Sequence, residues 1–80
     1  MLEKAVELLG YCYEFEGDAL KPVRVAVGRF VQAHEETNFS MVDVKSTMEL
    51  LEAFEASWSN IREEDAPYIR GILMRLRDLV

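Results

Sequence analysis

Apolar residues recur at helical spacing along most of the chain, and the stretch from Met41 to Trp58 is the clearest example. At about 100° per residue, its apolar positions fall on one side of a helix and its charged positions on the other. The pattern therefore predicts an amphipathic helix with one packing surface. That predicted surface consists of Met41, Val44, Met48, Leu51, Phe54 and Trp58, with Leu50 at its border.

Ser40 is the predicted start of this helix. Its side chain can accept a hydrogen bond from the backbone N–H of Asp43 while the Asp43 carboxylate reaches back, which is a capping box with Asp in place of Glu or Gln. Downstream, Asn60 is a favourable N-cap residue with Glu63 three positions later. This spacing predicts a short helical turn over residues 60–65.

A last helix is predicted to start at Asp65 and Pro67 and to run toward Val80. Proline suits the first turn of a helix, where its missing N–H would be unpaired in any case. Met74 lies alone on the polar side of this predicted helix. The predicted buried positions are Ile69, Ile72, Leu73, Leu76, Leu79 and Val80.

The N-terminal stretch from Leu2 to Glu16 is also predicted as a helix, and its apolar surface is unusually broad. Leu8, Tyr11 and Phe15 form a second apolar stripe beside the first. A helix with two such stripes either lies between two neighbours or contributes one stripe to another chain. The first stripe consists of Leu2, Ala5, Val6, Leu9, Cys12 and Tyr13.

Residues 11–31 fit two structures. Val23, Val25 and Val27 alternate with other residues as in a strand, so a β-hairpin across residues 17–18 is an alternative. We favour a helix that starts near Lys21 or Pro22, because the helical period accounts for more positions. Its predicted inner face consists of Leu20, Val23, Val27, Phe30, Val31 and His34.

These stretches together predict an all-α fold, a small four-helix bundle made of two helical hairpins packed face to face. The chain has 80 residues, which is enough for a single helical domain over residues 1–80. Half of the residues are hydrophobic and 30% are charged, and this balance is typical of a globular protein rather than of a membrane span or a disordered chain.

Charge and cysteine content limit the partners and the compartment. The formal net charge of -6 argues against a general nucleic-acid binder, because such proteins neutralise phosphates with Lys and Arg. Arg70, Arg75 and Arg77 leave a dimeric DNA-binding regulator open as an alternative. The single cysteine, Cys12, and the absence of a signal-peptide pattern predict a cytoplasmic protein with no membrane contact.

No motif for catalysis, cofactor binding or metal binding stands out, since one His and one Cys cannot make a structural zinc site. His34 is the exception to consider, because it falls on an apolar helix face, where an imidazole needs a partner. It is interpreted first as a hydrogen-bonded core residue. A pH-sensitive contact and a catalytic base are the other interpretations, and an enzyme site around His34, Tyr13 and Cys12 stays as an alternative function.

The function predicted from these observations is contact with other proteins rather than catalysis. The chain has more apolar surface than so small a domain readily encloses, and it offers no set of catalytic groups. A symmetric homodimer would bury the excess by pairing one patch with itself. The predicted core of that interface is the second stripe of the N-terminal helix, Leu8, Tyr11 and Phe15.

Overall fold

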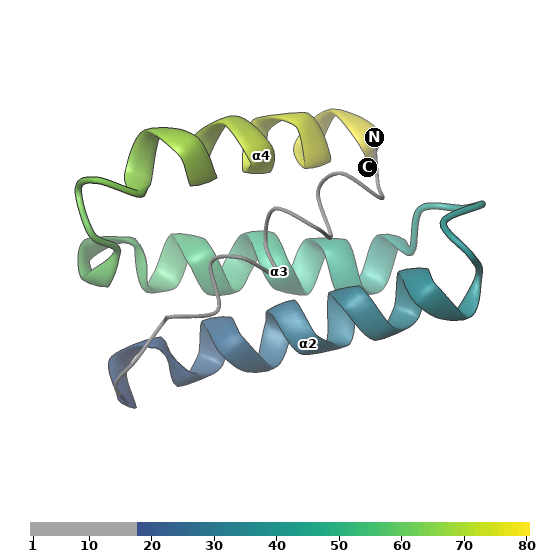
Figure 1. The fold of residues 1–80 in the computed structure, drawn as a ribbon, viewed down its shortest axis with the longest axis horizontal. Coiled ribbons are helices and arrows are strands. Elements are labelled where there is room, and N and C mark those ends of the chain that lie inside the picture. The colour runs from purple at the N-terminus through teal and green to yellow at the C-terminus, as the bar shows by residue number, and fades with distance from the viewer. Residues whose placement is uncertain (1–17) are drawn as a thin grey trace.

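The computed structural model describes residues 18–80, and this part of the chain is helical without strands (Figure 1). Its elements are, in order, the 3-10 turn η1 (Asp18–Leu20), α2 (Lys21–Glu36), α3 (Val44–Ala56), the 3-10 turn η2 (Trp58–Asn60) and α4 (Ala66–Leu79). The prediction of an all-α fold is confirmed for these residues. The predicted helix over residues 2–16, and with it the fourth member of the bundle, lies outside the described residues.

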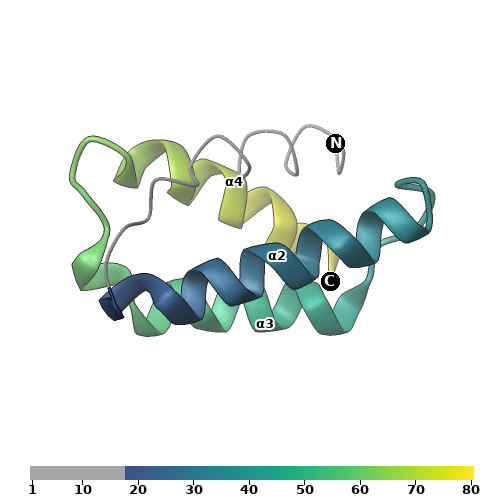
Figure 2. The same cartoon turned by 60° about the horizontal axis from the view of Figure 1, so that its bottom comes forward.

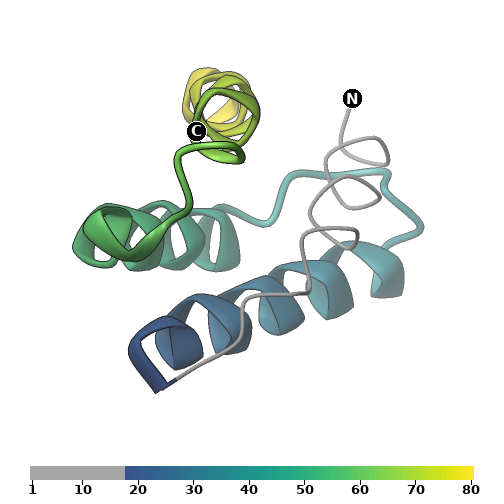
Figure 3. The ribbon, with the colours of Figure 1, turned by 60° about the vertical axis from the view of Figure 1, so that its left-hand side comes forward.

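The central helix of the described part is α3. Figure 1 shows α3 between α2 and α4, and it runs antiparallel to both. Figure 2 shows α2 and α3 side by side along most of their length, and this pair has the most extensive contacts between elements. Viewed toward the ends of the helices in Figure 3, α2, α3 and α4 occupy the corners of a triangle. One side of α3 therefore faces α2, and another faces α4.

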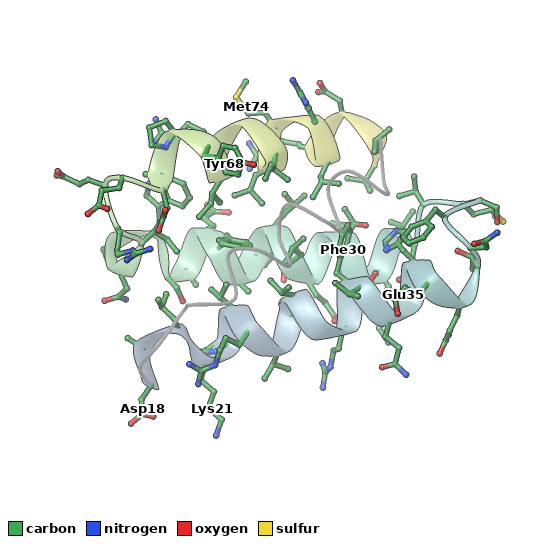
Figure 4. All side chains as sticks on the ribbon, in the orientation of Figure 1. Asp18, Lys21, Phe30, Glu35, Tyr68 and Met74 are labelled. Carbon is green, nitrogen blue, oxygen red and sulfur yellow. The ribbon has the colours of Figure 1, made fainter. Side chains whose placement is uncertain are left out.

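The core of the described part is built from apolar side chains of all three helices. Phe30 points from α2 toward α3 (Figure 4), and its exposed fraction is 0%. The inner face predicted for α2 is confirmed, with only Val31 left half-buried, and residues 18–31 are helical rather than a hairpin strand. The largest fully buried apolar side chains are Phe30, Phe54, Leu50, Ile69, Leu76, Val23 and Val27.

The predicted start of α3 is wrong by one turn. Ser40 does not cap the helix; its hydroxyl donates to the carbonyl oxygen of Thr37 at 2.6 Å. The N-cap is Asp43, whose carboxylate accepts from the backbone N–H of Ser46 at 2.9 Å. Before it, Asn38 and Phe39 have positive φ angles of 52° and 60°. The chain therefore reverses direction after α2, and the next helix begins later in the sequence than predicted.

The buried face of α3 is also rotated from the predicted one. Leu50 and Phe54 are fully buried as part of the core, but Met41, Val44 and Met48 are 69%, 52% and 48% exposed. Thr47 is buried instead, because its hydroxyl donates to the Asp43 carbonyl oxygen at 2.7 Å and so enters the core without an unpaired polar atom. The packing surface that was predicted toward the core therefore faces partly outward.

The connection to α4 differs from the prediction in one respect. The helical turn predicted over residues 60–65 is shifted: Asn60 is the last residue of η2, and the turn that follows is closed by the Arg62 carbonyl oxygen, which accepts from the backbone N–H groups of Asp65 and Ala66. The start of α4 is confirmed, with Pro67 in its first turn, although the Asp65 carboxylate accepts from Arg62 Nε at 2.9 Å rather than from the helix backbone. Ile69, Ile72 and Leu76 are buried as predicted, but Leu79 and Val80 are exposed.

Candidate protein-binding groove

His34 joins the end of α2 to the start of α3. Its ring is fully buried, with Nδ1 2.8 Å from the Phe30 carbonyl oxygen, and Nε2 accepts from the backbone N–H of Asp43 at 3.0 Å. This geometry assigns the ring proton to Nδ1 and makes the imidazole neutral. Both nitrogens are engaged by backbone groups, which is the arrangement of a hydrogen-bonded core histidine. The other members of the alternative site, Cys12 and Tyr13, lie outside the described residues.

Asp43 donates its backbone N–H to His34 and caps α3 with its carboxylate. Hydrogen bonds from the side chain and then from the backbone N–H of Ser46 lower the pKa of the Asp43 carboxyl, against a smaller opposing effect of desolvation. An ionised carboxylate at a helix N-terminus also interacts favourably with the helix dipole. The His34–Asp43 pair thus fixes where α3 begins and which side of α3 faces α2.

A groove lies between α3 and α4 on the surface, with a volume of about 590 Å³. Its apolar lining consists of large side chains, and charged groups complete the lining. The Arg70 guanidinium lies over the Trp58 ring, 5.2 Å from the ring centroid, which is within the range of a cation–π contact. The lining residues are Leu51, Glu55 and Trp58 from α3 and η2, and Arg70, Leu73, Met74 and Arg77 from α4.

The apolar surface continues beyond the groove along α3. Val44, Met48 and Leu51 are spaced i, i+4 and i+7, so they follow one side of the helix toward its N-terminus. On the other edge, Met74 points outward from α4 (Figure 4) and is 61% exposed. We name these four residues, Val44, Met48, Leu51 and Met74, the outer stripe; three of them are about half exposed or more. The groove and the outer stripe together form one apolar surface with arginines on its α4 side.

A second depression, between α2 and α3, has a different character. Its volume is about 670 Å³, but its apolar lining consists of the small side chains of proline, valine and alanine. Asp18, Lys21, Arg29, Glu49 and Glu52 line it as well, and Arg29 and Glu49 form an ion pair at 3.8 Å. Asp18 and Lys21 point away from α3 (Figure 4). A surface of mixed, exposed charges is typical of solvated helix faces, so the α3–α4 groove is the stronger candidate.

The interface residues predicted from the sequence, Leu8, Tyr11 and Phe15, lie outside the described residues. The groove itself was missed, because its α3 residues were assigned to the core. One signal was present in the sequence, because Met74 is isolated among polar residues and lies on the same side of its helix as Arg70 and Arg77. An exposed Met among Arg residues is typical of a binding surface rather than of a core.

No protein family, curated protein or solved structure matches the chain. Among residues 18–80, no helix has the length and apolar character needed to cross a bilayer. Within the same range, no three His, Cys, Asp or Glu side chains are grouped so that they could hold a metal ion. The function is therefore inferred from the groove and its chemistry.

Proposed function

We propose that this protein functions by binding protein partners, and that the α3–α4 groove with the outer stripe is the binding surface. The observation that carries the proposal is the exposure of Met48 and Met74, at 48% and 61%, next to a groove lined by Leu51, Trp58 and Leu73. Contiguous apolar surface on a small domain is typical of interaction sites.

The composition of this surface supports a protein partner. Trp and Arg are the side chains that most often dominate the binding energy of protein interfaces, and here Arg70 is held against Trp58. Methionine side chains are flexible and polarisable, so they adapt to the shape of a partner. The single cysteine supports a cytoplasmic location for this activity.

Site-specific photo-crosslinking tests the proposal. Benzoylphenylalanine in place of Met74 lies on the groove edge, and the same residue in place of Tyr68 is the matched control, because Tyr68 is 51% exposed and does not line the groove. In cell extract from the native source, we expect covalent adducts with a polypeptide from position 74 and not from position 68. Equal adduct formation at both positions, or none at position 74, would contradict the proposal.

A further inference from the structure

The chain carries a surface that complements its own groove. Residues 66–79 contain three arginines and one aspartate, a net charge of +2, whereas residues 44–56 contain one lysine and three glutamates, a net charge of -2. On α3, Glu55 is exposed and lines the groove beside Leu51, whereas Glu52 is exposed next to it and lines the α2–α3 depression. One helix therefore offers apolar side chains with carboxylates, and the other offers apolar side chains with guanidinium groups.

These charges are not paired with one another inside the described part of the chain. The ion pairs there are Arg29 with Glu49 and Arg62 with Asp65. Among the described residues, Glu52, Glu55 and Arg77 form no ion pair. Glu55 and Arg77 both line the groove, so each presents its charge at the surface where a partner would bind.

We infer that the occupant of the groove is α3 of a second copy of this chain, in a dimer with two-fold symmetry. This inference rests on the proposed function, because it names the partner of the same surface. In such a dimer, each α3 lies along the groove of the other copy and turns its outer apolar side toward it, which is the helix-in-groove mode of recognition. Met48 and Leu51 of one copy then contact Leu73 and Met74 of the other, and every contact occurs twice.

Symmetry also brings the charges together in a definite register. A two-fold axis across the paired α3 helices makes them antiparallel, so the C-terminal half of one α3 lies beside the N-terminal half of the other. Within one copy, α3 and α4 are antiparallel, so the N-terminal half of α3 lies beside the C-terminal half of α4 (Figure 1). Glu55 of one copy therefore lies near Arg77 of the other, at the rim of an apolar contact.

A charge exchange between two variants tests the inference. We expect Arg77→Glu and Glu55→Arg each to weaken self-association by about tenfold or more, because each places like charges opposite one another twice in the dimer. When the two variants are mixed, both positions regain an opposite charge. The mixture is expected to associate within a few-fold of the wild type, as measured by sedimentation equilibrium over a dilution series.

Arg75→Glu is the matched control. It makes the same change of charge on an exposed residue of α4, but Arg75 does not line the groove, so self-association should be unchanged. Circular dichroism of all variants checks that they remain folded.

The outcomes separate this inference from the proposed function. A wild type that stays monomeric at every concentration, a dimer that is insensitive to Arg77→Glu, or a mixture that fails to associate would overturn the second copy as occupant. If crosslinking from position 74 still yields an adduct with a different protein, the proposed function stands and the partner is that protein. If position 74 yields no adduct at all, both fail.

Discussion

Two sides of α3 carry apolar residues, but only one of them is buried in the fold. The side toward α2 carries Thr47, Leu50 and Phe54, all fully buried, and the other side carries Val44 and Met48, each about half exposed. Hydrophobicity alone would place the second side in the core, because the first side includes the polar residue Thr47. The first side can be buried because the Thr47 hydroxyl donates to the Asp43 carbonyl oxygen, so its burial leaves no polar atom unpaired. Polar groups with local partners can enter a core, and the apolar side left outside becomes available for binding.

The largest expected effect is on the inner side of α3. Replacing Phe54 by Ala removes a fully buried ring, and we expect a loss of about 3 to 5 kcal/mol in the free energy of unfolding, measured with urea. Such a loss approaches the whole stability of a small domain. Met48→Ala on the outer side is the control and should change the same quantity by about 0.5 kcal/mol or less. Similar losses for the two variants would remove the distinction between the sides.

The next effect tests the contact that orients α3. His34→Leu keeps an apolar side chain of similar volume but leaves the backbone N–H of Asp43 without its acceptor. We expect a loss of about 1 to 3 kcal/mol in the free energy of unfolding. Glu35→Leu, on the exposed neighbour, is the control. Backbone NMR should show the Asp43 amide among the most perturbed signals in His34→Leu; an unperturbed Asp43 amide would mean that this hydrogen bond does not fix the helix start.

A smaller effect is expected from the charge of Asp43. Because its pKa is lowered in the folded state, the ionised carboxylate stabilises the fold above the ordinary value of about 4, and this stabilisation is lost as the pH falls through the lower, folded value. Asp43→Asn keeps a capping acceptor without a titrating group. The difference in unfolding free energy between wild type and Asp43→Asn should shrink from about pH 6 to about pH 3. A difference that stays constant over this range would contradict the assignment.

The smallest effect on stability, paired with a large effect on binding, is expected on the outer side. Met48→Lys adds charge to a half-exposed position and should change the free energy of unfolding by about 0.5 kcal/mol or less. The same variant should lose the groove-dependent adducts or the self-association described above, since a lysine in the centre of an apolar contact is desolvated without a partner. A variant that unfolds instead would show that Met48 belongs to the core.

Periodicity and proline placement predicted α4 and favoured a helix for α2, where alternating valines left a β-hairpin as the alternative. They were not sufficient for α3. Ser40 and Asp43 are both good N-cap residues, but only Ser40 is followed three positions later by a carboxylate, so the local sequence favoured Ser40. The choice depends on His34, nine residues earlier, which accepts from the Asp43 N–H only after the turn at Asn38 and Phe39 has brought the helices together.

The groove could not be predicted for a related reason. It requires the relative placement of Trp58, Arg70 and Leu73, which come from different elements, and that placement follows from how α4 packs on α3. Sequence patterns identified the residues as apolar or basic but gave no basis for separating a core position such as Leu50 from a groove position such as Leu51.

The contact between His34 and Asp43 also has a consequence for the order of folding. Its two residues are close in the sequence, so the loop that joins them closes quickly, and contacts of this kind form early in folding. We expect α2 and α3 to assemble first as a helical hairpin, with α4 docking afterwards through Ile69 and Leu76. Within residues 18–80, the groove is then completed only when α4 docks, so the proposed binding through the groove would require α4 to be in place.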